Sequence, residues 1–126
     1  MTKSSEQANY DTFKNYESVL KSTSLFLELF NTATQVSFSD MEVEITILYA
    51  GKDAFDTDLL VHPLETTITF NDYESDTETT VTAAVFMYNL IKRWGTLVPD
   101  RWVEDHDAED ASFWFQIGMF GEFIYG

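Results

Sequence analysis

The apolar positions of residues 5–32 repeat at the spacing of one face of an α-helix. Successive apolar residues are separated by three, four, seven and three positions, at Phe13, Tyr16, Leu20, Leu27 and Phe30. These separations keep the side chains on one side of a helix, where they form a stripe that a core can bury. We therefore expect a long amphipathic helix over residues 5–32.

Residues 41–49 alternate between apolar and polar side chains. Met41, Val43, Ile45, Ile47 and Tyr49 occupy one set of positions, and Glu42, Glu44 and Thr46 occupy the other. This period of two predicts a strand with one face in the core and one acidic face in water, as an antiparallel sheet permits. Val36 and Phe38 either begin this strand earlier or form a bend before it.

Two shorter segments also fit an extended backbone. Residues 59–61 are apolar and end just before Pro63, and the residue that precedes a proline favours extended geometry. Residues 66–70 are β-branched and alternating, with Ile68 and Phe70 on one side. With short connections between them, the three segments predict a three-stranded antiparallel meander.

A second helix is predicted over residues 76–94, after a polar turn at residues 71–78. Its apolar residues have helical spacing, at Val81, Ala84, Val85, Tyr88, Ile91 and Trp94. Lys92 and Arg93 suit the last turn, and Gly95 suits the position that follows a helix.

The aromatic residues 112–125 fit both a strand and a helix. Phe113, Phe115, Ile117 and Met119 alternate, whereas Phe113, Ile117 and Phe120 have helical spacing after an acidic first turn. Gly118 and Gly121 weigh slightly against a long helix. The elements together predict an α+β fold in which two principal helices pack on a small, mainly antiparallel sheet, as a single domain over residues 1–126.

Composition supports a folded chain held together without covalent links. Of the 126 residues, 44% are hydrophobic and 16% are aromatic, which is enough apolar surface for a core. The absence of cysteine excludes disulfides and thiolate zinc sites. No segment resembles a signal peptide or a membrane span, so we expect a cytoplasmic protein with no membrane partner.

Charge is the most informative property of the sequence. Asp and Glu number 22 against seven Lys and Arg, which gives a net charge of −15. Small domains need a net charge of only about 2–8 for solubility, and a larger excess costs stability through self-repulsion. So few basic residues also exclude direct nucleic-acid binding, which depends on Lys and Arg.

The usual signatures of catalysis and of metal binding are missing. The chain has no nucleophile elbow, no phosphate-binding glycine loop and no His placed near a Ser, and neither His62 nor His106 supports a catalytic role. His106 stands alone among carboxylates, and the acids from Asp72 to Glu78 lack the glycine and the final Glu of a calcium loop. We expect no catalytic residue, metal or cofactor.

The acids instead form clusters that could contact a basic protein surface. We expect the interface on two runs that are too acidic to be buried without partners, namely Asp72, Glu74, Asp76, Glu78 and Glu104, Asp105, Asp107, Glu109, Asp110. The competing surface is the strand row of Glu42 and Glu44. Tyr73, Trp102 and Trp114 lie near the acids and are either interface anchors or core residues.

In size, low pI, lack of cysteine and clustered acids, the chain resembles the small acidic inhibitors encoded by phages and mobile elements. These include the DNA-mimic anti-restriction and anti-CRISPR proteins. The resemblance is one of overall character and carries no functional positions over. It implies a non-catalytic inhibitor that blocks a basic nuclease or another nucleic-acid-binding enzyme in a host cytoplasm. An immunity protein against a basic nuclease toxin, and an acidic scaffold or solubility domain, share the same character.

Overall fold

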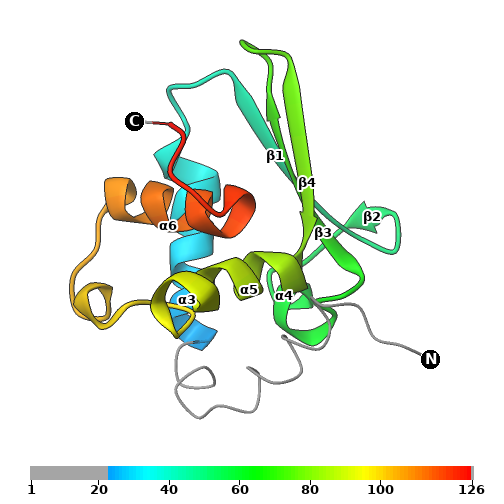
Figure 1. The fold of residues 1–126 in the computed structure, drawn as a ribbon. Coiled ribbons are helices and arrows are strands. Elements are labelled where there is room, and N and C mark those ends of the chain that lie inside the picture. Colours follow the sequence, from blue (N-terminus) through cyan, green and yellow to red (C-terminus); the bar gives the residue numbers. More distant parts are fainter. Residues whose placement is uncertain (1–22, 126) are drawn as a thin grey trace.

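The computed structural model describes residues 23–125, which form an antiparallel sheet with helices on one side (Figure 1). The strands are β1 (Val43–Tyr49), β2 (Lys52–Asp53), β3 (Thr66–Asp72) and β4 (Thr77–Thr82), in the order β2-β1-β3-β4. Every pair of neighbouring strands is antiparallel. The predicted α+β class is confirmed.

Three helices of ten or more residues cover the inner face of the sheet (Figure 1). They are α3 (Thr23–Thr32), α5 (Ala83–Trp94) and α6 (Ala108–Phe120). Shorter elements are the π-helix η1 (Ala33–Ser37), α4 (Asp58–Val61) and the 3-10 helix η2 (Asp100–Trp102).

The first predicted helix is confirmed over Thr23–Thr32, and the rest of its range lies outside the described residues. The helix continues directly into η1, which contains Val36. Phe38 then packs into the core at a bend before β1, so neither residue extends the strand. Strand β1 itself follows the predicted period of two, because Val43, Ile45 and Ile47 pack against the core.

The prediction of a strand at residues 59–61 is wrong, because these residues form the short helix α4. The Asp58 carboxylate accepts a hydrogen bond from the Phe55 amide at 2.9 Å, which closes a turn just before the helix. One helical turn also buries Leu59 completely while Val61 stays exposed. Three apolar residues are too short a run to distinguish the two periods.

The second predicted helix begins later than expected, because residues 77–82 form β4 rather than its first turns. Four threonines and Val81 dominate this segment, and β-branched side chains favour a pleated strand. Thr82 then ends the strand and caps α5, since its hydroxyl accepts a hydrogen bond from the Val85 amide at 3.1 Å. At the other end of α5, Gly95 has φ of 75°, as the predicted cap requires.

Residues 108–120 form helix α6, so the aromatic segment that fitted both a strand and a helix is mostly helical. Gly118 and Gly121, which weighed slightly against a long helix, do not interrupt it. Gly118 packs against Phe86 of α5, and a Cβ at this position would overlap the Phe86 ring. Gly121 has φ of 75° and follows the end of the helix. Both glycines therefore support α6 instead of interrupting it.

Aromatic rings dominate the core, both among the three long helices and between these helices and the sheet, where Phe70 of β3 meets Phe115 and Phe120 of α6. The rings of Phe26, Phe86 and Trp114 contact one another edge to face, with centroids 5.3–6.0 Å apart. Trp114 is fully buried and donates its indole N–H to the Leu97 carbonyl at 2.8 Å, and Trp102 is 6% exposed. Both tryptophans are therefore core residues and not interface anchors.

Candidate functional site

The outer face of the sheet is turned away from all three long helices (Figure 1). The strand register places one row of side chains from each strand on this face, because directly opposed residues point the same way. We call this surface the outer sheet face; it comprises Glu42, Glu44, Thr46, Leu48, Thr67, Thr69, Asn71, Glu78, Thr80 and Thr82.

The outer sheet face joins acids from two of the three clusters seen in the sequence. Glu44 lies opposite Asn71, and Asn71 lies opposite Glu78, so the two carboxylates belong to one row across three strands. Neighbouring strands lie about 4.8 Å apart, which places their Cα atoms about 9.6 Å apart. Glu42 stands two residues from Glu44 along β1, about 6.8 Å away. All three glutamates are exposed.

Tyr73 lies beside these glutamates at the end of the outer sheet face. Its amide donates to the Glu42 carbonyl at 2.9 Å, and its hydroxyl donates to Oε1 of Glu44 at 3.2 Å. The hydrogen bond to Glu44, partial burial and the negative charges of Glu44 and Glu78 raise the pKa of Tyr73 above its ordinary value of 10.0. The ring is 55% exposed, so it offers an aromatic contact among carboxylates.

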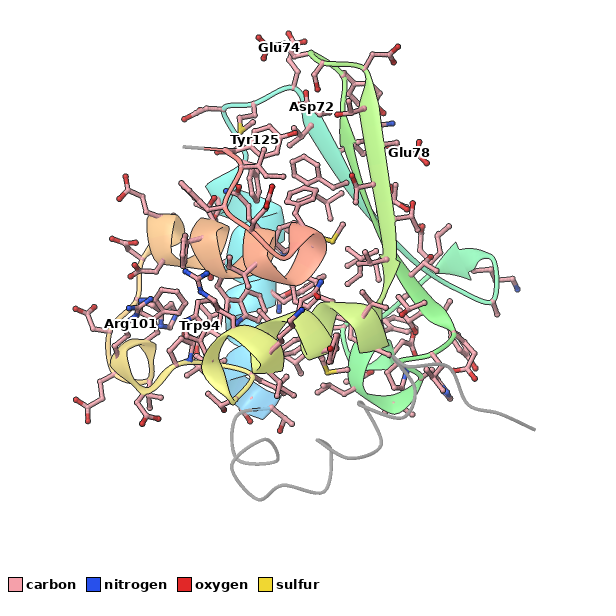
Figure 2. The ribbon with its side chains drawn as sticks, viewed as in Figure 1. Asp72, Glu74, Glu78, Trp94, Arg101 and Tyr125 are labelled. Carbon is pink, nitrogen blue, oxygen red and sulfur yellow. The ribbon has the colours of Figure 1, made fainter. Side chains whose placement is uncertain are left out.

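Asp72 does not belong to this surface, contrary to the sequence prediction, because its side chain points to the opposite side of the sheet (Figure 2). It is 5% exposed and accepts hydrogen bonds from the hydroxyls of Ser75 and Tyr125 at 2.8 and 2.9 Å. The amides of Glu74 and Ser75 also donate to it. The Ser75 and Tyr125 hydroxyls hold the pKa of Asp72 below its ordinary value of 3.8, against the effect of burial.

The remaining acids of the first run lie at the tip of the β3–β4 hairpin. Glu74 and Asp76 are exposed in the turn that joins the strands, and Asp76 has φ of 54°. The tip projects beyond the helices, and Figure 2 shows Glu74 at its end. Glu74 and Asp76 therefore extend the negative charge of the outer sheet face.

The second acidic run surrounds the start of α6, on the side of the molecule away from the outer sheet face (Figure 1). Asp107 and Asp110 form a capping box, in which each carboxylate accepts a hydrogen bond from the other residue's amide, at 2.9 and 3.1 Å. Glu104 and Asp105 are exposed in the preceding loop, and Glu109 is exposed on the helix. The structure thus separates the two runs that were expected to share one interface.

Basic residues are scarce around the outer sheet face. The lysines and arginines of residues 23–125 are Lys52 in β2, Lys92 and Arg93 at the end of α5, and Arg101 in η2. The two arginines rest on aromatic rings, with Arg101 4.6 Å from the centroid of Trp102 and Arg93 5.9 Å from that of Phe113. Within this part of the chain, none of these four cations forms an ion pair with the acids of the outer sheet face.

Both histidines have structural contacts. His62 stacks on Tyr49, with ring centroids 4.4 Å apart. His106 lies 3.1 Å from the Trp102 carbonyl through Nδ1 and 3.4 Å from Oε1 of Glu28 through Nε2.

Across residues 23–125, no three histidine or acidic side chains converge on a point where they could hold a metal ion. Over the same residues, no helix has the length and apolar character of a membrane span.

The C-terminal tail is fixed by a buried glutamine that the sequence analysis did not single out. The Gln116 side chain is fully buried in α6 and accepts hydrogen bonds from the amides of Ile124 and Tyr125 at 2.9 and 2.6 Å. Its Nε2 donates to the Tyr125 carbonyl at 3.0 Å and to the Ser112 hydroxyl at 3.1 Å. No local pattern reveals this role, because Ile124 and Tyr125 lie beyond the end of the helix.

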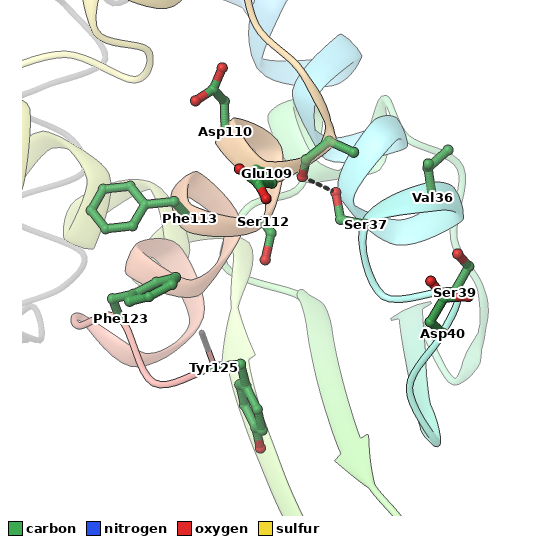
Figure 3. Close-up of a pocket in the computed structure, with 11 residues that line it drawn as sticks. Val36, Ser37, Ser39, Asp40, Glu109, Asp110, Ser112, Phe113, Phe123 and Tyr125 are labelled. Carbon is green, nitrogen blue, oxygen red and sulfur yellow. Dashed lines mark hydrogen bonds between the residues drawn. The ribbon is translucent and has the colours of Figure 1, made fainter.

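Beside the fixed tail lies an open groove, which sequence reasoning also missed (Figure 3). We call it the C-terminal groove, and its volume is about 680 Å³. Its walls come from η1 and the residues after it, from the first half of α6 and from the tail; they comprise Val36, Ser37, Ser39, Asp40, Ala108, Glu109, Asp110, Ser112, Phe113, Phe123 and Tyr125. A hydrogen bond of 2.6 Å from the Ser37 hydroxyl to the Ala108 carbonyl joins two of the walls.

Comparison with known proteins yields no relative: no protein-family model, curated protein or solved structure matches the chain.

Proposed function

We propose that the protein is a non-catalytic inhibitor that occupies a basic, nucleic-acid-binding surface of another protein through the outer sheet face. The observation that carries the proposal is the convergence of Glu42, Glu44 and Glu78 on one exposed face, although Glu78 is more than 30 residues away in sequence. A sheet positions its side chains more rigidly than a loop does, so these charges keep a fixed spacing.

That spacing suits a surface built to hold phosphates. Alternate residues of a strand repeat about every 6.8 Å, and each DNA strand carries one charge per about 3.4 Å along the helix axis. Arginines and lysines arranged for a phosphate backbone would therefore meet a regular array of carboxylates. Exposed Tyr73 adds an aromatic contact at the acidic end of this array.

The proposal assigns no catalytic role to either histidine. His62 stacks on Tyr49, and His106 contacts a carbonyl oxygen and Glu28, so each imidazole is engaged in packing. An immunity protein that neutralises a basic nuclease toxin would use the same surface chemistry, and the identity of the captured partner distinguishes the two roles.

The test is capture of the partner followed by competition with DNA. The immobilised full chain is expected to retain a basic protein from a lysate at low salt and to release it on addition of duplex DNA. Release by salt is also expected, because the Debye length falls from about 10 Å at 0.1 M salt to about 3 Å at 1 M. Retention that neither DNA nor salt reverses contradicts the proposal.

Two charge-reversal variants locate the contact. The combined substitutions Glu42→Lys, Glu44→Lys and Glu78→Lys should abolish retention. The matched control Asp100→Lys, Glu104→Lys and Asp105→Lys changes the net charge equally, at exposed residues before α6, and should keep most of it. Circular dichroism verifies that both variants fold. Equal losses in the two variants would mean that total charge, and not the outer sheet face, controls binding.

A further inference from the structure

The C-terminal groove has the size and the open form of a binding site. Its volume of about 680 Å³ lies within the range of about 300–1,000 Å³ found for ligand sites in proteins. It opens on the helix side of the sheet, so it is separate from the outer sheet face (Figure 3). Any ligand of the groove is therefore an addition to the proposed inhibitory contact.

Hydrogen bonds hold the C-terminal tail, which forms one wall of the groove, in place. The Gln116 side chain accepts hydrogen bonds from the backbone amides of Ile124 and Tyr125, and the Tyr125 hydroxyl donates to Asp72 in β3. These bonds leave Phe123, a large apolar residue that lines the groove, 49% exposed. Val36 on the opposite wall is 53% exposed. A ligand with apolar groups would cover surfaces that the fold itself leaves in water.

Within residues 23–125, the charged side chains that line the groove are all acidic. They are Asp40, Glu109 and Asp110, and none of the lysines, arginines or histidines of this part of the chain is among the lining residues. Asp110 already accepts a hydrogen bond within the capping box, whereas Asp40 and Glu109 are exposed. Hydroxyls of three serines add polar contacts among the carboxylates. The complementary ligand therefore carries positive charge and hydrogen-bond donors.

The rings of the groove favour a guanidinium over a compact cation. Phe113 and Phe123 contact each other with centroids 5.1 Å apart, and both line the groove. Phe113 already has the Arg93 guanidinium 5.9 Å from its centroid within the fold. A planar guanidinium can stack flat on a ring and still present paired N–H donors at its edge to a carboxylate, whereas an ammonium is a compact, strongly hydrated point charge without this planar geometry.

We propose that the C-terminal groove binds a peptide segment that carries an arginine next to an apolar side chain. The arginine lies between the rings of Phe113 and Phe123 and the carboxylate of Glu109, and Asp40 on the opposite wall adds to the negative charge of the groove (Figure 3). The neighbouring apolar side chain covers Val36 or Phe123. This site is distinct from the proposed inhibitory surface, so each of the two proposals can be tested independently of the other.

The test uses the full chain and a defined probe, the fluorescein-labelled peptide Gly-Leu-Arg-Leu-Arg-Gly. The matched control peptide has citrulline in place of both arginines, which keeps the shape and removes the charge. Fluorescence anisotropy should give an affinity about fivefold to tenfold higher for the arginine peptide. Equal affinity for the two peptides overturns the proposal.

Variants separate the groove from the overall charge. The pair Asp40→Asn and Glu109→Gln should weaken binding of the arginine peptide about fivefold, because it removes two of the three carboxylates that line the groove. The control pair Glu104→Gln and Asp105→Asn removes two charges outside the groove and should change the affinity by less than about twofold. A loss as large in the control pair overturns the assignment to the groove.

A second readout fixes the location without any variant. In ¹H–¹⁵N spectra, addition of the arginine peptide should shift the amide signals of residues 36–40, 108–113 and 122–125. Shifts confined to residues 42–46 and 78–82 would place the peptide on the outer sheet face instead and overturn the proposal. Peptide binding that persists in the variant with Glu42→Lys, Glu44→Lys and Glu78→Lys distinguishes this site from the inhibitory one.

Discussion

The β3–β4 hairpin and the start of α6 carry similar runs of acids, yet the two regions use them differently. At α6, Asp107 and Asp110 satisfy each other's amides, so two of the five carboxylates serve the helix end. At the hairpin, Asp72 alone is buried, and Glu78 joins Glu42 and Glu44 on an open face. Acids of the same density in sequence thus serve capping, internal hydrogen bonding or surface charge according to the backbone that holds them.

We expect the largest loss of stability when Asp72 is truncated, and little loss when Glu78 is truncated. Asp72 accepts hydrogen bonds from two hydroxyls and two amides, and Asp72→Ala leaves these four donors without their acceptor. This variant should therefore lower the free energy of unfolding more than the loss of any other acid among residues 23–125. The matched truncation Glu78→Ala removes an exposed carboxylate and should have little effect. Urea unfolding of both variants measures the contrast, and similar losses would contradict the burial of Asp72.

In the unmodified protein, acid should weaken the hydrogen bonds that the Asp72 carboxylate accepts. The pKa of Asp72 is lower in the folded state than its ordinary value of 3.8, so its ionised form favours folding. This contribution is complete above about pH 3.8 and disappears as the pH falls through the folded pKa. Urea unfolding between pH 5 and pH 2 should therefore show a steeper loss of stability in the unmodified protein than in Asp72→Ala. Parallel curves would contradict the assignment.

An intermediate effect is expected at the start of α6. Asp107→Ala removes the side chain that caps the helix and accepts from the Asp110 amide at 2.9 Å, which should cost about 1 kcal/mol of unfolding free energy. Glu104→Ala, in the same acidic run but without a cap contact, serves as the control. Thermal unfolding measures the difference, and equal results for both would mean that Asp107 acts only through its charge.

The smallest effect belongs to the outer sheet face. Glu44→Gln and Glu78→Gln, made together, relieve repulsion between neighbouring exposed acids and should change the unfolding free energy by less than about 0.5 kcal/mol. The same pair should nevertheless weaken partner binding, because it removes two of the three convergent charges. A large loss of stability here would show that these glutamates support the fold rather than a partner.

The sequence predicted those parts of the fold that depend on neighbouring residues. The period of two in β1 and the C-terminal glycine of α5 are local signals, and both predictions are confirmed. Gly118 misled the prediction of α6, because its role depends on Phe86, which lies on a different helix. Local propensity gives no information about such a close approach between helices.

The candidate site was predictable only in part, for the same reason. The row of Glu42 and Glu44 was visible in the alternation of β1. Glu78 joins them only through the register of β3 between β1 and β4, and Asp72 turns inward to meet Tyr125, 53 residues further along the chain. The C-terminal groove likewise depends on three segments that no single stretch of sequence relates.

The position of β4 at the edge of the sheet has a consequence for self-association. Among residues 23–125, β4 pairs only with β3, so its other edge is open to hydrogen bonding by a further strand. Two copies that met along this edge would each carry a large negative charge, and this repulsion would oppose the pairing. The excess of acids that suits a basic partner would therefore also oppose self-association through β4.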